Sequence, residues 1–510
     1  MKFRTGVSRD QPLLLPPQVD EWLPPGHLAR VVAEAVEGLD LTAAESAFHQ
    51  KGPGASAYPP KLLLSLLIYG YLTQRFSSRR ISQACHEDLA FLWLSQMTQP
   101  KHSTLAAFRQ QHRDDLPGWM AQVVCLCIDL GMVGFQVGAV DGTKIHADAS
   151  KHKAMSYQRM KELIPQLEEE LATLVAAHGA ADGADTAPPA PDVPADHAER
   201  VRERLTRIRQ AKADLEARWA TEHPDSEEPA GTAQINFTDP ESRIMVTKNQ
   251  GVQQAYNAQI VVDAQEGVIV GTALSAHAND VREFVPALEA VEATTGQTFE
   301  KVTADAGYFS ADNVAEAAAH QVDAYIAAGS DQWRTVQGHP LFGKGQFEYD
   351  ADTDTYQCPA HQVLSHHGDR TESVGGGQER TVALYHGDRA TCGACPLKDQ
   401  CLSPKQTVKR LTRGADDAIR DAMKAKVRTP EGDAVYRQRK GIVEPAFGII
   451  KETLGFRQWS LRGLTKVTGE WALVIIAYNI RKIARKLVRV TQDTGTFWNL
   501  SRLRADGATS

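Results

Sequence analysis

Val137-Gly138-Ala139-Val140-Asp141-Gly142 is an apolar run that ends in an acid and a glycine. A short apolar run of this kind, bounded by turn residues, is typical of a buried strand. We expect two more strands at 255–263 and 267–274, joined by a tight turn at 264–266, and further strands at 301–304 and 323–327. A helical stretch is expected at 281–294, between the strands at 267–274 and 301–304. Strands that are followed by alternating helix and strand predict an α/β fold.

Residues 1–125 are expected to form a helical N-terminal domain. The run 61–72 follows Pro59-Pro60 and is apolar nearly all round, which predicts a buried helix. Ser103 is expected to cap a helix over 104–112. The polar, Arg-containing start at 77–80 is compatible with a helix-turn-helix and equally with a plain helical bundle.

Two inserts divide the α/β core into the segments 130–155, 230–341 and 429–490. Residues 156–229 predict a helical hairpin, because apolar residues recur at helical spacing on both sides of a Gly, Ala, Pro and Asp-rich linker at 178–191. Pro165 is expected in the first turn of the first hairpin helix. Residues 342–428, which we call the Cys-bearing insert, hold four of the seven cysteines. The last helices of the core are expected at 442–453 and 471–487.

The net charge of −7 over 510 residues is unevenly distributed. Residues 401–510 carry 22 Lys and Arg against 10 Asp and Glu, so they total +12 and residues 1–400 total −19. A basic C-terminal part suggests phosphate contacts, although a solvated basic face explains the charge equally well. The chain shows neither a signal-peptide pattern nor an apolar run long enough for a bilayer, so we expect a cytoplasmic protein with no membrane partner.

A third acid has an unusual setting, because Glu444 lies in the basic, helix-compatible run from Tyr436 to Lys451. Asp141 and Asp305 each end an apolar, strand-like run upstream. Three carboxylates suit two hard divalent cations, which can activate a water or a 3′-hydroxyl for attack on a phosphodiester. The alternative is that the two aspartates are turn residues and Glu444 is an exposed helix charge.

The cysteines fall into two groups. Cys392 and Cys395 have the spacing of a metal knuckle, and together with Cys358 and Cys401 they could hold a structural Zn²⁺. His361 is an alternative ligand, and free thiols, an iron–sulfur cluster or a redox pair remain open. The other three cysteines lie in apolar helical stretches and are expected in the core: Cys85, Cys125 and Cys127.

Other polar and aromatic residues have structural interpretations that we favour. His146 and Asp148 fit a polar strand end better than a supporting role at the acids. Residues 277–280 are expected to cap the helix that begins near residue 281. Trp459 and Arg462 could stack on a frayed base, but Trp459 fits a core position better.

Several ordered blocks resemble the bacterial insertion-sequence transposases of the DDE class, and the resemblance covers most of the chain. The blocks are Val-Asp-Gly-Thr-Lys-Ile at 140–145, Asp-Pro-Glu-Ser-Arg at 239–243, Gln-Ala-Tyr-Asn-Ala-Gln at 254–259, Ala-Asp-Ala-Gly-Tyr at 304–308, Val-Glu-Pro-Ala-Phe-Gly-Ile-Ile-Lys at 443–451, Glu-Trp-Ala-Leu at 470–473 and Tyr-Asn-Ile-Arg-Lys at 478–482. The helical region 50–115 is similar to the domain that precedes the catalytic core in that family.

The resemblance implies an RNase H-like mixed sheet with flanking helices. Asp141, Asp305 and Glu444 would be the catalytic acids and would hold two Mg²⁺ or Mn²⁺. It also implies DNA contacts from a Tyr, an Arg and a Lys of the last block, here Tyr436, Arg439 or Lys440, and Lys451. The family places the Arg four residues before the Glu, a position that Lys440 occupies in this chain. The gap of 139 residues between Asp305 and Glu444 is long, and the Cys-bearing insert explains it.

The sequence therefore predicts a DNA transposase. It would bind the terminal inverted repeats of its own element, acting as a homodimer, cleave the ends to free 3′-hydroxyls and transfer them to double-stranded target DNA. Two alternatives remain open, namely a DNA-binding relic or repressor that has lost cleavage, and a metal-dependent nuclease that cuts without joining.

Overall fold

The computed structural model describes residues 18–46, 57–181, 196–247, 251–329, 332–336, 338–374 and 378–507. The chain divides into two compact units. Unit 1 comprises Met1–Gly134, Val262–Val270 and Glu444–Ser510, and unit 2 comprises Phe135–Val261 and Gly271–Val443.

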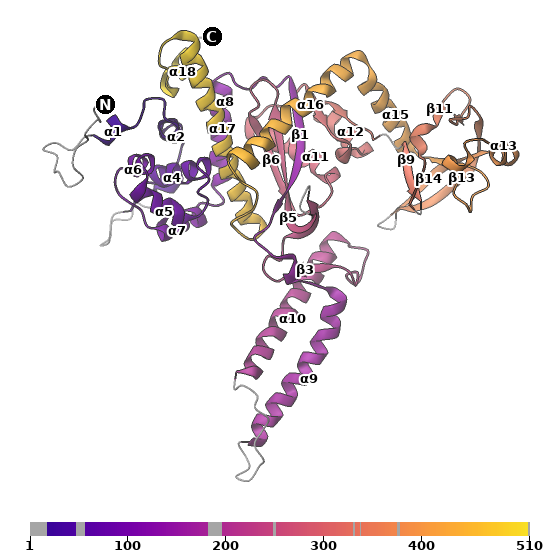
Figure 1. Ribbon diagram of the computed structural model, residues 1–510, viewed down its shortest axis with the longest axis horizontal. Helices are drawn as coiled ribbons and strands as arrows, with labels where there is room; N and C mark the ends of the chain where they lie inside the picture. Colours follow the sequence, from indigo (N-terminus) through magenta and orange to yellow (C-terminus); the bar gives the residue numbers. More distant parts are fainter. Residues whose placement is uncertain are drawn as a thin grey trace, which may run out of the picture. The chain divides into compact units, whose positions relative to one another are not determined.

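Unit 1 is helical (Figure 1). Its helices are α1 (Val19–Trp22), α2 (Leu28–Glu37), α3 (Thr42–Ser46), α4 (Pro60–Leu72), α5 (Ser78–Glu87), α6 (Leu89–Leu94), α7 (His102–Gln111), α8 (Leu116–Asp129), α17 (Leu464–Thr494) and α18 (Leu500–Gly507), with a π-helical turn at Ile449–Thr453. The expected buried helix is α4, which begins at Pro60 and buries nearly every side chain. The long helix α17 packs against α8, α4 and α2. The N-terminal helices and the end of the chain thus share one core.

One expected cap in this unit is wrong. Helix α7 begins at His102 after Lys101, and no side chain caps it, so Ser103 lies inside the helix. By contrast, α5 has a serine cap, because the Ser77 hydroxyl accepts a hydrogen bond from the Arg80 amide at 3.2 Å. The backbone is extended before both helices, so the N-cap residue separates them, because Ser77 has an acceptor side chain and Lys101 has none.

A six-stranded mixed sheet forms the α/β core, with strand order β4-β5-β1-β7-β8 and β6 paired with β5. The strands are β1 (Val137–His146), β4 (Arg243–Thr247), β5 (Gly251–Asp263), β6 (Ile269–Ser275), β7 (Lys301–Ala304) and β8 (Asp323–Ile326). β7 is parallel to both β1 and β8, whereas β4 is antiparallel to β5. This order and the accompanying helices confirm the expected mixed α/β fold with a helical N-terminal region.

Helices follow the strands as the sequence indicated. α11 (Phe284–Thr295) lies between β6 and β7 after a short 3-10 turn at Val281–Glu283, and α12 (Ala311–Ala319) lies between β7 and β8. α15 (Ala415–Arg428) is held at the edge of the sheet by Lys426, which forms an ion pair with Asp323 and donates to the Ala324 carbonyl at 2.7 Å. α16 (Pro430–Gly448) comes next and begins well before the expected residue 442.

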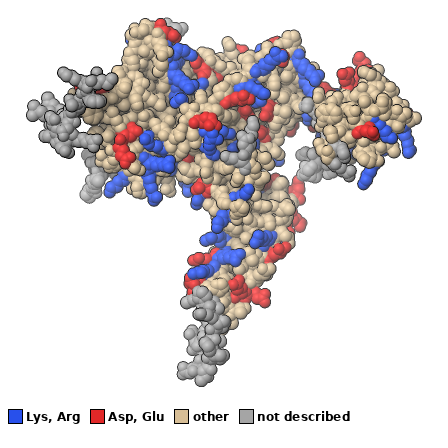
Figure 2. Space-filling model, viewed as in Figure 1, with Lys and Arg blue, Asp and Glu red and all other residues tan. Residues whose placement is uncertain are grey.

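The hairpin insert consists of α9 (Tyr157–Ala181) and α10 (His197–Glu222), which lie side by side and extend from the small β2–β3 ladder, Ala154–Ser156 with Gln234–Asn236 (Figure 1). Its apolar core includes Leu167, Leu205 and Leu215. Pro165 is inside α9 and not in its first turn, because the helix begins at Tyr157. The expected linker overlaps the end of α9, and its part at 182–191 lies outside the described residues. Figure 2 shows cations and acids interleaved along the hairpin.

The Cys-bearing insert contains a sheet of its own. Its strands β11 (Glu348–Asp350), β12 (Thr355–Gln357), β13 (Val363–Val374), β14 (Gln378–Gly387) and β15 (Arg410–Arg413) form an antiparallel sheet in chain order. The hairpin β9 (Trp333–Val336) and β10 (His339–Phe342) precedes it. The short helices α13 (Arg389–Gly393) and α14 (Lys398–Cys401) lie between β14 and β15. In the part of the chain that the structure describes, every helix is too short or too polar to traverse a bilayer.

Candidate active site

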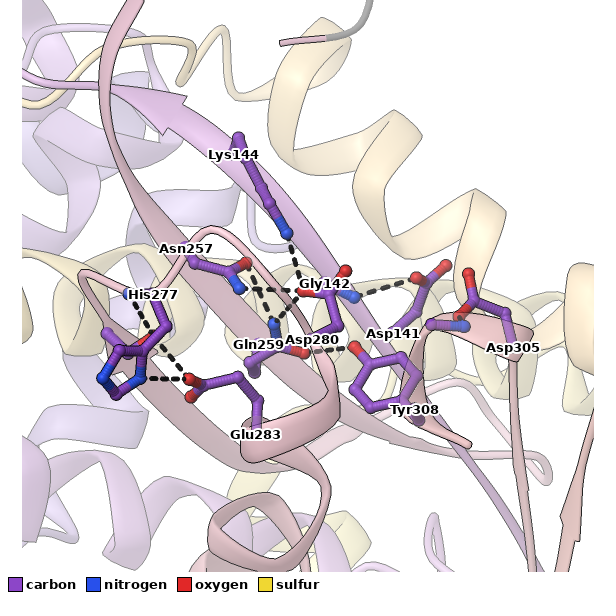
Figure 3. A network of polar contacts seen from close by, with 12 residues as sticks. Asp141, Gly142, Lys144, Asn257, Gln259, His277, Asp280, Glu283, Asp305 and Tyr308 are labelled. Carbon is purple, nitrogen blue, oxygen red and sulfur yellow. Dashed lines mark hydrogen bonds and ion pairs between the residues drawn. The ribbon is translucent and has the colours of Figure 1, made fainter. Parts of the chain in front are cut away.

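Asp141 and Asp305 come together through strand register. In the parallel β1–β7 pair, Ala139 is opposite Thr303. Each aspartate lies two residues farther along its own chain, so both fall on the same face and at the same level. Adjacent strands are about 4.8 Å apart, and Figure 3 shows the two carboxylates facing one another. Asp141 does not end its strand, as the sequence suggested, because β1 continues to His146.

The two carboxylates are held by neighbouring backbone amides. Asp141 Oδ1 accepts from the Gly142 amide at 2.8 Å, and Asp305 Oδ1 accepts from the Gly307 amide at 2.8 Å. Burial raises the pKa of Asp141 to about 6. The Gly142 amide and Arg439 oppose this rise, whereas the negative charges of Asp305 and Asp280 add to it. Asp141 is therefore a carboxylate whose charge the protein alone compensates poorly.

Helix α16 contributes a cation and a phenol to the same place. Arg439 Nη1 lies 3.5 Å from Asp141 Oδ2. Its Nε is buried and has no hydrogen-bond partner among the described residues. Tyr436 hydrogen-bonds Arg439, and the charges of Asp305 and Asp141 add to the rise in its pKa that burial mainly causes. Of the two candidate cations, Arg439 is the one at the aspartates, whereas Lys440 is exposed.

Glu444 lies on α16, five residues beyond Arg439, and is exposed. Pro445 follows it inside the helix, where proline removes the amide that would bond to the Gly441 carbonyl. The π-helical turn begins five residues after Glu444, and such turns often occur at functional sites. The described residues contain no group of three His, Cys, Asp or Glu side chains already arranged to hold a metal.

Asp280 is joined to this region by contacts that the sequence did not reveal. Its Oδ1 accepts from Lys144 Nζ at 2.6 Å, from Asn257 Nδ2 at 2.8 Å and from Gln259 Nε2 at 3.0 Å (Figure 3). Asp280 occupies the position before the 3-10 turn at Val281–Glu283, but its side chain makes no capping bond there. The prediction that Asp280 caps this helix is therefore wrong, because its carboxylate accepts hydrogen bonds from three donors on two strands.

Gln259 connects this network to the aspartates. Its Oε1 accepts a hydrogen bond from the Tyr308 hydroxyl. Burial raises the pKa of Tyr308 well above its ordinary value, and the charges of Asp280, Asp141 and Asp305 add to the effect. Tyr308 is therefore a neutral donor at neutral pH. A Cβ on Gly142 would come within 2.3 Å of Gln259 Nε2, which explains the glycine after Asp141.

The remaining predicted DNA contacts differ in exposure. Arg462 is exposed, and Lys451 is half-buried with its ammonium 5.7 Å from the centre of the Phe447 ring. Trp459 is only 2% exposed and packs edge-on against Trp471, with ring centroids 5.8 Å apart. We therefore correct the assignment of Trp459 as a DNA contact, because stacking on a base would require it to leave this core.

The structure brings four of the cysteines together. One pocket is lined by Cys358, Cys392, Cys395 and Cys401, whereas His361 is exposed and does not line it. Cys85 and Cys127 are buried as expected, but Cys125 is exposed on α8. His146 and Asp148 lie at and just after the end of β1, as expected of a polar strand end.

Two family models match this chain. A transposase domain (DUF772) matches residues 17–111, which include helices α1 to α7 of unit 1. A transposase DDE domain matches residues 357–484, a segment that contains Glu444, Lys451 and the four clustered cysteines but begins after both aspartates. Among curated proteins, none matches. The two matches agree with the mixed sheet that bears the paired aspartates, and together they support an insertion-sequence transposase of the DDE class.

Proposed function

We propose that this transposase binds the terminal inverted repeats of its own element as a homodimer, cleaves the ends and joins them to target DNA. The observation that carries the proposal is the in-register pair Asp141 and Asp305, with the Arg439 guanidinium, whose Nε is buried, beside it. Support also comes from the transposase families that match the chain, since a transposase acts on DNA. Glu444 is proposed as the third acid, on the same helix as Arg439.

The donor set fits hard divalent cations. Carboxylate oxygens are the preferred ligands of Mg²⁺ and Mn²⁺, and the poorly compensated charge of Asp141 would be stabilised by a cation. Asp141, Asp305 and Glu444 would hold the ions. When bound, two such cations would activate the nucleophile and neutralise charge on the leaving oxygen. The four cysteines lie outside this reaction, and their metal is a separate proposal.

The chemistry consists of two in-line displacements at phosphorus. In cleavage, water attacks, the bond between phosphorus and the 3′-oxygen breaks, and the 3′-oxygen takes up a proton. In joining, that 3′-hydroxyl attacks a target phosphodiester, and an equivalent bond breaks in the target, so no external energy source is needed. Arg439 would donate to the scissile phosphate through its unpartnered Nε, because a buried donor without a partner is costly unless a ligand supplies one. Lys440, Lys451 and Arg462 would contact the DNA backbone farther away.

The direct test uses labelled duplex DNA that carries the element's own ends, incubated with the purified chain and Mg²⁺, Mn²⁺ or EDTA. We expect nicks at the 3′ ends and joined product with either cation, and neither with EDTA. Tight binding with no cleavage under any condition would favour the DNA-binding relic. Nicks without joined product, even from precut ends, would favour the nuclease.

Asp280→Asn is expected to slow cleavage by about 10- to 100-fold, the range for residues that orient metal ligands. The variant keeps the shape of Asp280 but loses the charge that holds Lys144, while DNA affinity should stay unchanged. Single-turnover cleavage and a binding titration measure the two quantities, with Glu292→Gln on the exposed face of α11 as the control. If the ion pair acts as one unit, Asp280→Asn combined with Lys144→Met loses no more than the worse single variant. A wild-type rate in Asp280→Asn would remove this residue from the site.

A further inference from the structure

The four cysteines of the Cys-bearing insert come from separate segments but surround a single space. Cys358 follows β12, Cys392 lies in α13, Cys395 lies between α13 and α14, and Cys401 ends α14. We call the space that they line the thiol pocket, and its cavity volume is about 30 Å³. A space of that size accommodates about one water molecule or one ion.

Backbone amides already point at two of the sulfurs. The Gln362 amide donates to Cys358 Sγ at 3.3 Å, and the Leu397 amide donates to Cys395 Sγ at 3.4 Å. In both places a proline follows the cysteine, at residues 359 and 396, so the chain turns and brings later amides back to the sulfur. Amide donors stabilise a sulfur that carries negative charge, as they do around metal-bound ligands.

The backbone of the neighbouring strand leaves room for a third sulfur. Gly387 ends β14, and a Cβ at this position would lie 2.7 Å from Cys392 Sγ. Any larger residue would push the sulfur out of the thiol pocket. Lys409, which is 3% exposed, lines the same pocket and donates to the Phe342 carbonyl at 2.6 Å. The pocket is thus built around sulfur and positive charge.

All four of these cysteines are free, so no disulfide occupies them.

The insert also has a small hydrophobic core. The main buried cluster among its described residues consists of Phe342, Phe347, Tyr356, Leu364, Tyr385 and Leu411, and Cys358 and Cys401 pack against its edge. A small sheet with a limited core is the kind of module that a structural metal stabilises, because binding free energy then adds to folding free energy.

We propose that Cys358, Cys392, Cys395 and Cys401 bind one Zn²⁺ that ties the segment after β12 to the segment between β14 and β15. Four thiolates at about 2.3 Å in tetrahedral geometry are the usual closed structural site for this ion. No three potential ligands in the described residues already stand at metal-binding spacing, so binding draws the sulfurs inward from the pocket walls. The proposal does not depend on the transposition chemistry.

The test measures zinc in the purified full-length chain by elemental analysis. We expect about one Zn²⁺ per chain, retained through gel filtration. Cys392→Ser and Cys358→Ser should each lose most of it, whereas Cys125→Ser, at the exposed cysteine of α8, should keep it. Zinc content that is unchanged in both insert variants would overturn the proposal.

Cobalt provides a readout that needs no variant. Wild-type chain stripped of metal and titrated with Co²⁺ should develop the thiolate-to-cobalt charge-transfer and d–d absorption of a tetrahedral tetrathiolate site, saturating at about one equivalent, and Zn²⁺ should abolish it. A titration that produces no such absorption would also overturn the proposal, whatever the variants show.

Discussion

Asp141→Asn and Asp305→Asn proteins are each expected to cleave the element's ends on the order of 10³-fold more slowly than the wild type, with DNA binding retained. Each substitution keeps the size of the side chain and removes one of the charges that would hold the cations and so stabilise charge at the phosphodiester. Single-turnover cleavage in Mg²⁺ measures the loss. Asp312→Asn is the matched control, because Asp312 is an exposed acid in the first turn of α12, seven residues after Asp305.

The same variants separate a catalytic role from a structural one. Burial raises the pKa of Asp141 to about 6, so the folded protein holds its charge at a cost. Asp141→Asn removes that cost and should leave the free energy of unfolding unchanged or slightly higher. Wild-type cleavage by either aspartate variant would contradict the assignment. Lost cleavage with a large loss of stability would make the aspartates structural.

Glu470→Ala is expected to destabilise unit 1 by about 3 kcal/mol, the largest effect on stability that we predict. Glu470 is fully buried on α17 and accepts from the Ser460 amide at 3.0 Å, the Leu461 amide at 3.1 Å and the Tyr71 hydroxyl at 3.0 Å, as well as from the Ser460 hydroxyl. Truncation leaves these buried donors without an acceptor. It also breaks a connection between α4, within the DUF772 match, and α17, within the DDE match.

Urea unfolding followed by tryptophan fluorescence measures this loss, since Trp459 and Trp471 lie in the same unit. Burial raises the pKa of Glu470, so its charge is costly, and Glu470→Gln should lose only about 1–2 kcal/mol. Glu452→Ala is the control. It removes an exposed ion pair with Arg457 and should change stability by less than about 0.5 kcal/mol. Equal stability of Glu470→Ala and Glu452→Ala would show that the network contributes little.

The sequence reveals the elements whose signal is local. The strands around Asp141 and Asp305 are predictable because buried parallel strands are continuous apolar runs. The helix α4 is predictable because it is apolar all round and follows two prolines. The extent of β1 is not predictable, since its second half is polar and is held in the sheet by pairing with neighbours.

The contacts of residues that come together only in the folded chain cannot be predicted from the local sequence. Asp280 follows a strand and precedes a helical turn, a position that usually caps, and only the folded sheet brings Lys144 and Asn257 to it. Lys440 occupies the position at which the family has its Arg, but the rotation of α16 brings Arg439 to Asp141. The predicted helix positions of Pro165 and Ser103 are wrong for a related reason. Where a helix begins depends on its packing.

Part of the positive charge in the C-terminal part of the chain is paired with acids. The basic C-terminal part of the chain includes α15 and α16, and Figure 2 shows Lys and Arg side chains over this region. Several of these cations have acidic partners, such as Arg437 with Asp433 and Arg413 with Asp421. Net charge alone therefore overstates how many cations remain for phosphates.

We propose that Asp141 and Asp305, at the strands, and Glu444, on α16, act as one catalytic unit. Single-turnover cleavage in Mg²⁺ by Glu444→Gln, by Asp305→Asn and by the double variant tests this proposal. We expect each single variant to cleave about 10³-fold more slowly and the double variant to lose no more, because residues that act as a unit are not additive. Wild-type cleavage by Glu444→Gln, or losses that multiply in the double variant, would contradict it.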